Sequence, residues 1–206
     1  MADKQNDSIT ITTLGASGAG KTCFLVGMYA IMRAGVRGFT FAARDLDQDL
    51  VLSNWWDQLL IQQGKNRWPP PNDNNPIEYE FDLCYGLNTW KSFTWFDYRG
   101  SALRDKQDVS DVKRLQQYFS KSDSVFLCLP ADQFARGQRD ASIGRMTQYL
   151  SDLRKSGRQP DIAIILTKGD LLGSQMKADQ VVERVQKWFE PLFVSGACQG
   201  VGGRAG

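Results

Sequence analysis

The residues best suited to chemistry lie at positions 15–22, where the sequence reads Gly-Ala-Ser-Gly-Ala-Gly-Lys-Thr. This is the complete G-x-x-x-x-G-K-[ST] spacing of a loop whose backbone N–H groups surround phosphate oxygens. The glycines allow the tight curl, Lys21 can reach the β- and γ-phosphates, and the Thr22 hydroxyl can ligate Mg²⁺. We therefore predict a nucleotide phosphate site formed by Gly15, Ala16, Ser17, Gly18, Ala19, Gly20, Lys21, Thr22 and Cys23.

Two flanking segments must hold this loop in place. Residues 9–14 alternate apolar and polar side chains as a strand does, and residues 23–32 are an apolar run long enough for a buried helix. A helix that begins here adds unpaired N–H groups and the positive end of its dipole to the phosphate site. A glycine-rich turn without a ligand is the plain alternative, but strand, loop and helix agree in favouring nucleotide binding.

A second motif follows the apolar strand 93–96, which ends in D-x-x-G at Asp97–Gly100. A carboxylate at the end of that strand would face the Mg²⁺ site, and the N–H of Gly100 could bind a γ-phosphate. The alternative for Asp97 is a side chain that merely caps the end of the strand.

A third motif, T-K-x-D, follows the buried strand 162–166 and comprises Thr167, Lys168 and Asp170. An aspartate can accept hydrogen bonds from guanine N1–H and from its 2-amino group, and adenine offers neither donor at those places. The lysine stem can lie along the base, and the later Ser195-Gly196-Ala197 loop could donate a backbone N–H to guanine O6. The alternative for Asp170 is a helix N-cap.

With these motifs in this order, residues 8–198 resemble a Ras-like small GTPase domain of the translation-factor-related class of P-loop GTPases. The resemblance implies an α/β P-loop NTPase fold: a three-layer sandwich around a mainly parallel sheet with one antiparallel edge strand. It implies GTP or GDP with Mg²⁺, ligated through Thr22 and Asp97, and a molecular switch that hydrolyses GTP. A non-hydrolysing nucleotide-binding interaction module is the alternative, and a small-molecule kinase is a third interpretation.

Two positions depart from the family pattern. Ser101 stands where many small GTPases carry the glutamine that positions the attacking water. We therefore expect slow or partner-assisted hydrolysis, with Lys21 and Ser101 as the candidate catalytic residues. Thr40 has a spacing from Thr22 that suits the switch threonine that binds Mg²⁺, but Phe39 and Phe41 flank it as they would a threonine on an ordinary strand.

The segment 45–76 is a larger departure, an insertion between the first helix and the hairpin. Residues 45–63 have helical periodicity, with Leu52, Trp55, Trp56, Leu59 and Leu60 on one stripe, and residues 65–76 form a proline-rich loop. The tryptophans either pack as core or form a partner surface, and we favour packing. An effector or activating partner is expected to use residues 40–70 and 100–110.

The remaining pattern is that of one α/β domain over residues 1–206. Residues 77–83 and 93–96 predict a hairpin, and residues 125–129 and 162–166 predict buried strands. Helices are expected near residues 110–119 and 141–155, and at 178–189, where Pro191 should end the last one. The glycine-rich tail 199–206 is unsuited to the helix that normally closes the family's fold, so either the chain belongs to a longer protein or a neighbour covers that surface.

Composition excludes several functions. A net charge of +2 favours neither nucleic acid nor an acidic membrane as partner, and the absence of histidine removes histidine acid–base chemistry and the usual zinc sites. The four cysteines have no C-x-x-C spacing and indicate free thiols. With neither a signal sequence nor a lipidation motif, we expect a soluble, cytoplasmic protein with no direct membrane anchor.

Overall fold

A computed structural model describes residues 8–70, 76–98, 117–137, 141–155, 157, 159–172 and 178–193. Along the chain the elements are β1 (Ile9–Leu14), α1 (Lys21–Ala34), β2 (Phe39–Ala43), α2 (Leu46–Ile61), the 3₁₀ turn η1 (Gly64–Arg67), β3 (Ile77–Tyr85), β4 (Asn88–Asp97), β5 (Ser124–Pro130), α4 (Ala131–Ala135), α5 (Ala141–Lys155), β6 (Asp161–Thr167), the 3₁₀ turn η3 (Gly169–Leu171) and α6 (Ala178–Phe193). Residues 117–121 form a further helical turn before β5.

The strands form one six-stranded sheet in the order β2-β3-β4-β1-β5-β6, in which only β3 runs against the others. The predicted mainly parallel sheet is confirmed. The antiparallel strand is second from the edge, because residues 39–43 add an outer strand to the predicted hairpin. Parallel order brings the carboxyl ends of β1, β4, β5 and β6 to the same edge, which is where such sheets bind ligands.

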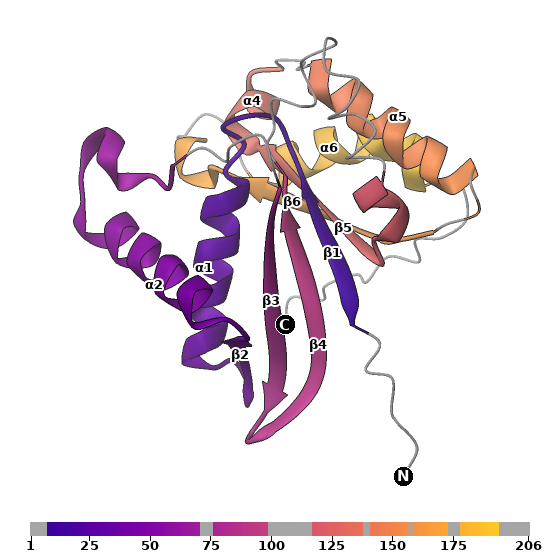
Figure 1. The fold of residues 1–206 in the computed structure, drawn as a ribbon. Coiled ribbons are helices and arrows are strands. Elements are labelled where there is room, and N and C mark those ends of the chain that lie inside the picture. Colours follow the sequence, from indigo (N-terminus) through magenta and orange to yellow (C-terminus); the bar gives the residue numbers. More distant parts are fainter. Residues whose placement is uncertain are drawn as a thin grey trace.

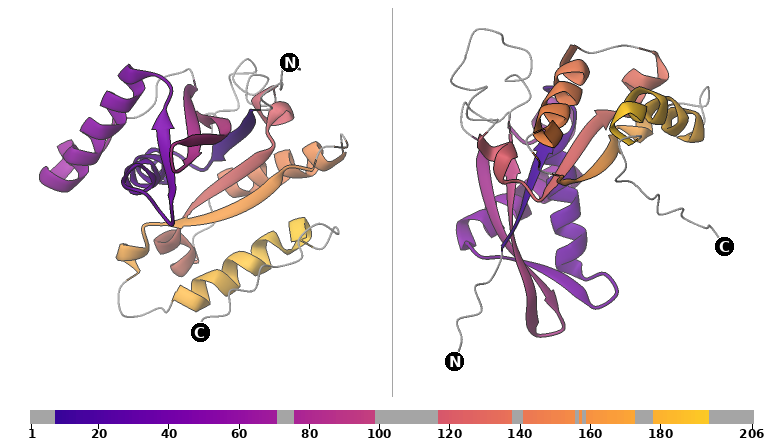
Figure 2. Two further views of the ribbon diagram at one scale, coloured as in Figure 1. Left: turned by 90° about the horizontal axis from the view of Figure 1, so that it is seen from below. Right: turned by 90° about the vertical axis from the view of Figure 1, so that its right-hand side faces the viewer.

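Helices cover both faces of the sheet, so the predicted three-layer α/β sandwich is confirmed (Figure 1). On one face, α1 and α2 pack on β3 and β4 around Leu25, Leu52, Phe81 and Trp95. On the other, α5 and α6 cover β5 and β6 with a cluster that includes Leu127, Met146, Leu150 and Phe189. The views of Figure 2 show the two helical layers on opposite sides of the strands.

The insertion packs as part of the core, as the sequence analysis favours. Asp45 caps α2 by accepting a 2.9 Å hydrogen bond from the Asp47 N–H. Trp55 and Trp56 are half-buried against the core. Leu60 does not belong to the buried stripe, since its side chain is exposed.

Two element boundaries differ from expectation. The helix α6 continues through Pro191 to Phe193, because a proline in the last turn removes only one intrahelical hydrogen bond. Residues 65–67, expected in a loop, belong to the 3₁₀ turn η1 instead. The helix expected near 110–119 lies mostly outside the described residues, as do the loop 195–197 and the tail 199–206.

Candidate functional site

The phosphate loop joins the end of β1 to the start of α1, as the motif predicts. Gly20 precedes the helix with φ of 83°, a left-handed conformation that glycine adopts without strain. Gly15 must also be glycine, because a Cβ there would lie 2.5 Å from the Cys128 carbonyl oxygen of β5. No side chain caps α1 and no acidic residue occupies its first turn, so its N–H groups are available to an anion.

Lys21 is buried beneath the loop, where its ammonium donates two 3.1 Å hydrogen bonds to the Gly15 and Ala16 carbonyl oxygens. Burial lowers the pKa of Lys21, and the negative charge of Asp97 opposes this shift. A buried ammonium inside a ring of backbone dipoles is suited to pairing with phosphate oxygens, whose charge would compensate for its lost hydration.

Thr22 and Asp97 meet at the start of α1, although 75 residues separate them in the sequence. The Thr22 hydroxyl donates a 2.6 Å hydrogen bond to a carboxylate oxygen of Asp97, which is fully buried at the end of β4. β4 lies beside β1 with Asp97 level with Thr13, so the sheet register delivers the carboxylate to the loop. The carboxylate of Asp97 is thus held against the first turn of α1.

The T-K-x-D segment reaches the phosphate loop through a hydrogen bond. The Thr167 hydroxyl donates to the Ala19 carbonyl oxygen at 2.6 Å, which fixes the end of β6 against the loop. Lys168 then takes a left-handed conformation (φ 56°) and Asp170 lies in the turn η3. Lys168 is the residue that precedes this turn, so Asp170 is not a helix N-cap and its exposed carboxylate faces the cavity.

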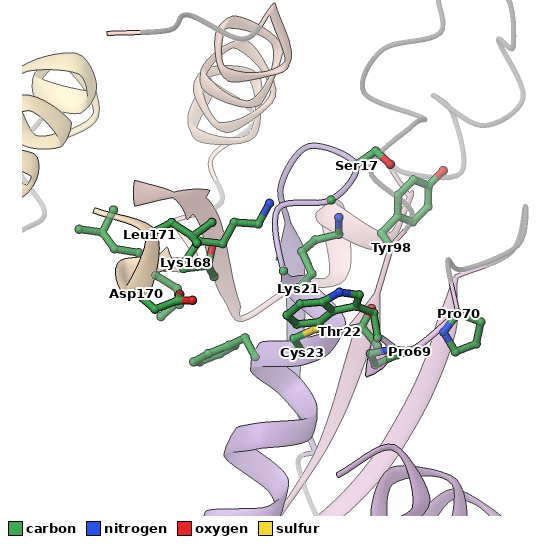
Figure 3. A pocket seen from close by; sticks show the side chains of 17 residues that line it. Ser17, Lys21, Thr22, Cys23, Pro69, Pro70, Tyr98, Lys168, Asp170 and Leu171 are labelled. Carbon is green, nitrogen blue, oxygen red and sulfur yellow. The ribbon is translucent and has the colours of Figure 1, made fainter. Parts of the chain in front are cut away.

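Lys21, Thr22 and Asp170 line one cavity of about 950 Å³, within the size range of small-molecule sites. Asp97 is fully buried and reaches this cavity only through its hydrogen bond with Thr22. Its floor is the loop and the first turn of α1, and one wall is formed by Lys168, Asp170 and Leu171. In Figure 3, Lys21 and Thr22 lie between this wall and the prolines on the opposite side. The predicted residues that the structure brings to the cavity are Ser17, Gly18, Gly20, Lys21, Thr22, Cys23, Thr167, Lys168 and Asp170.

The opposite wall consists of Trp68, Pro69 and Pro70, which were not predicted from the sequence as site residues. Arg67 supports it, donating a 2.6 Å hydrogen bond to the Leu59 carbonyl oxygen of α2 and lying 5.4 Å from the centre of the Trp68 ring. The order and direction of the strands could have indicated this wall. The segment that precedes the hairpin must return to the carboxyl edge of the sheet, because β3 runs away from that edge.

Thr40 is not brought to the site. It pairs with Cys84 of β3, whereas Asp97 is level with Ile77 at the other end of the same strand. The seven residue steps from Ile77 to Cys84 correspond to about 23 Å of strand, too far for a shared metal ion. The expected switch threonine is thus an ordinary strand residue here, because residues 39–43 form an added edge strand. Gly100, Ser101, Ser195, Gly196 and Ala197 lie outside the described residues.

Cys23 lies between the two walls, and burial raises the pKa of its thiol. Cys128 is buried beneath the loop and its pKa is raised to about 12 for the same reason. Both thiols are therefore neutral at physiological pH. The three cysteines in the described part of the chain are free, as predicted.

Two solved structures resemble this chain at low sequence identity. A chain of the signal recognition particle receptor SRb-GTP/SRX complex from Chaetomium thermophilum is 17% identical with a TM-score of 0.49. The match covers 90% of this chain and 80% of that one. A putative nucleolar GTP-binding protein 1 from Plasmodium falciparum is 13% identical with a TM-score of 0.40, over 91% of this chain and 74% of that one. No curated protein sequence is similar enough to count as a match.

The described helices include none that is both long and apolar enough to cross a bilayer. The family model described as Double-GTPase 2 matches residues 9–196, which is most of the chain, and the chain therefore belongs to this family of GTPase domains.

Proposed function

From membership of the double-GTPase 2 family, we propose that this chain binds GTP and GDP with Mg²⁺, hydrolyses GTP to GDP and phosphate, and acts as a molecular switch. The observation that carries the proposal is that Lys21, Thr22 and Asp170 line one cavity, with the buried Asp97 carboxylate bonded to Thr22. The narrower resemblance to Ras-like GTPases remains a prediction.

The Thr22–Asp97 pair fits Mg²⁺. A hydroxyl and a carboxylate 2.6 Å apart supply the hard oxygen donors that this ion prefers, and Mg²⁺ bound there would neutralise charge on the β- and γ-phosphates. The two residues would hold the ion, while Lys21 would bind the same phosphates from the loop side. Since Thr40 lies at the far end of β3, we leave it out of this set.

Guanine specificity would come from the wall at the end of β6. Asp170 carries an exposed carboxylate at the cavity, which suits two hydrogen bonds from guanine. Thr167, in place of the family's more common asparagine, keeps the wall attached to the phosphate loop through the Ala19 carbonyl oxygen. This hydrogen bond supports the assignment of residues 167–170 to the base end of the cavity.

Hydrolysis would lack the glutamine that usually positions the attacking water, because Ser101 stands in its place. We expect slow or partner-assisted attack of water on the γ-phosphate. Single-turnover phosphate release from the GTP complex tests this step, with Lys21→Met as the control that removes the ammonium. Release above the Lys21→Met background supports a GTPase. Equal release from both proteins, alone and with candidate partners, would favour the non-hydrolysing binding module.

The switch output would pass through the insertion. Trp68 lines the cavity, and Arg67 links this wall to α2, so a nucleotide that moves Trp68 also acts on the helix. The outward side of α2 exposes Leu46, Leu50, Leu60 and Ile61. We therefore keep residues 40–70 as the proposed surface for an effector or activating partner, together with residues 100–110.

A further inference from the structure

A second exposed apolar surface lies at the end of the molecule opposite the nucleotide cavity. We call it the distal tip and define it by Val36, Arg37, Tyr85, Leu87, Trp90 and Lys91. Leu87 is completely exposed, Trp90 is 67% exposed and Tyr85 is 58% exposed. Figures 1 and 2 show the β3–β4 turn and the nearby start of β2 at the end of the sheet away from the phosphate loop.

The distal tip is an ordered structure made of two turns. The Gly86 N–H donates to the Gly38 carbonyl oxygen at 3.2 Å, which joins the hairpin turn to the turn between α1 and β2. The rings of Tyr85 and Trp90 lie 4.9 and 5.6 Å from that of Phe39. Because these rings pack on one another, their exposed edges form one continuous surface.

The side chains of Trp90 and Leu87 are exposed by a β-bulge and by a tight turn, neither of which requires an apolar residue at these positions. Leu83 pairs with Lys91 and Cys84 with Thr89, so Trp90 is the extra residue of a β-bulge, a feature that redirects a side chain. Leu87 occupies a two-residue turn, where polar residues and glycine are usual and no packing favours leucine. The exposed Leu87, between Tyr85 and Trp90, therefore contributes nothing evident to the stability of the folded chain.

The two charged residues of the distal tip are both positive, and the neighbouring Asp82 carboxylate is already bonded to the Ser92 hydroxyl and lies 3.8 Å from Arg44. Arg37 and Lys91 form no ion pair with the described residues, and the sequences 31–41 and 83–94 contain no aspartate or glutamate. Arg33 lies nearby but is paired with Asp49 at 2.8 Å. The overall charge of +2 conceals this local excess of positive charge.

We propose that the distal tip is a peripheral binding site for anionic lipid bilayers. Leu87 would enter the boundary between headgroups and acyl chains, with Trp90 and Tyr85 at headgroup level, where amphipathic rings are favoured. Arg37 and Lys91 would pair with anionic headgroups. A protruding turn buries its apolar side chains readily in a deformable bilayer, whereas a protein partner would need a matching hollow.

This site leaves the switch accessible. From Asn88 at the tip to Asp97 at the cavity, β4 spans about 30 Å, so the nucleotide cavity would face away from the membrane. The site is a local contact, which is compatible with the absence of a membrane-spanning helix among the described residues. It does not depend on the proposed nucleotide function.

Co-sedimentation with vesicles tests the proposal, using pure phosphatidylcholine and a mixture of phosphatidylcholine with phosphatidylserine. The full chain should bind the anionic vesicles more strongly, and increasing salt should weaken binding. Leu87→Asn should weaken partitioning at least tenfold, since burying a leucine side chain is worth a factor of roughly ten to a hundred. Lys91→Gln should weaken it about fivefold.

Matched controls remove comparable groups elsewhere. Ile61→Asn removes a side chain that is 78% exposed on α2, and Lys65→Gln removes an exposed lysine from η1; both should bind vesicles like the unmodified chain. Asparagine suits a turn, so Leu87→Asn should keep its unfolding midpoint. The proposal is overturned if the unmodified chain binds neither vesicle, if Leu87→Asn and Ile61→Asn weaken binding equally, or if Leu87→Asn abolishes self-association instead.

Discussion

Replacing Trp68 with alanine should weaken GDP binding by about fifteen- to twentyfold while leaving the fold intact. A tryptophan side chain presents up to about 250 Å², and Trp68 is 54% exposed at the cavity wall. If the nucleotide covers half of the exposed part, about 70 Å² leaves water, which at about 25 cal/mol per Å² is worth about 1.7 kcal/mol. Because the side chain has few core contacts to lose, the free energy of unfolding should change little.

The assay is calorimetric titration of GDP at constant Mg²⁺, with Trp90→Ala as the matched control. Trp90 is 67% exposed but lies at the distal tip, away from the cavity. Trp68→Ala should raise the dissociation constant and the rate of nucleotide release, and Trp90→Ala should change neither. Equal dissociation constants for the two variants would refute the assignment of Trp68 to the nucleotide wall.

Three further changes test other parts of the site. Thr22→Ala removes the hydroxyl that is bonded to Asp97, so the factor by which Mg²⁺ increases the affinity for GDP should fall about tenfold. This factor is the ratio of the GDP dissociation constants with and without EDTA. An unchanged ratio would place the ion elsewhere. Asp170→Ala should reduce the preference for GDP over ADP at least about tenfold in competition binding, and an unchanged preference would remove Asp170 from the base site. Burial raises the pKa of the Cys128 thiol from 9.0 to about 12, so the unfolded chain loses this proton first and the free energy of unfolding falls above pH 9. In urea unfolding from pH 8 to 11, the free energy of unfolding of Cys128→Ala should fall less steeply with pH, by up to about 1.4 kcal/mol per pH unit. An unaltered dependence on pH would exclude this thiol as the cause.

Much of the fold could be predicted because local patterns and tertiary structure agree. The alternating and apolar runs around positions 9–14, 125–129 and 162–166 became β1, β5 and β6, and the phosphate loop lies between strand and helix as its motif requires. The Asp97 carboxylate was expected to face the site of Thr22, and the two side chains are in contact because the parallel pairing of β1 and β4 brings the ends of these strands together. These features depend on short-range periodicity and on strand order.

The misses depend on longer-range geometry. Thr40 has a suitable spacing from the loop, but residues 39–43 add a strand at the sheet edge and carry it to the far end of β3. Trp68 was assigned to an insertion rather than to the site, because no periodicity shows that residues 64–70 return over the cavity. A proline interrupts a helix mainly where further intrahelical hydrogen bonds would follow. Pro191 lies in the last turn of α6, so the helix continues to Phe193.

Titration of the purified chain with GDP and with ADP, at the same Mg²⁺ concentration, tests the central claim most directly. Asp170 offers a carboxylate that guanine can satisfy with two donors and adenine cannot, so GDP should bind at least about a hundredfold more tightly. Equal affinity for the two nucleotides would contradict a guanine-nucleotide site in this cavity.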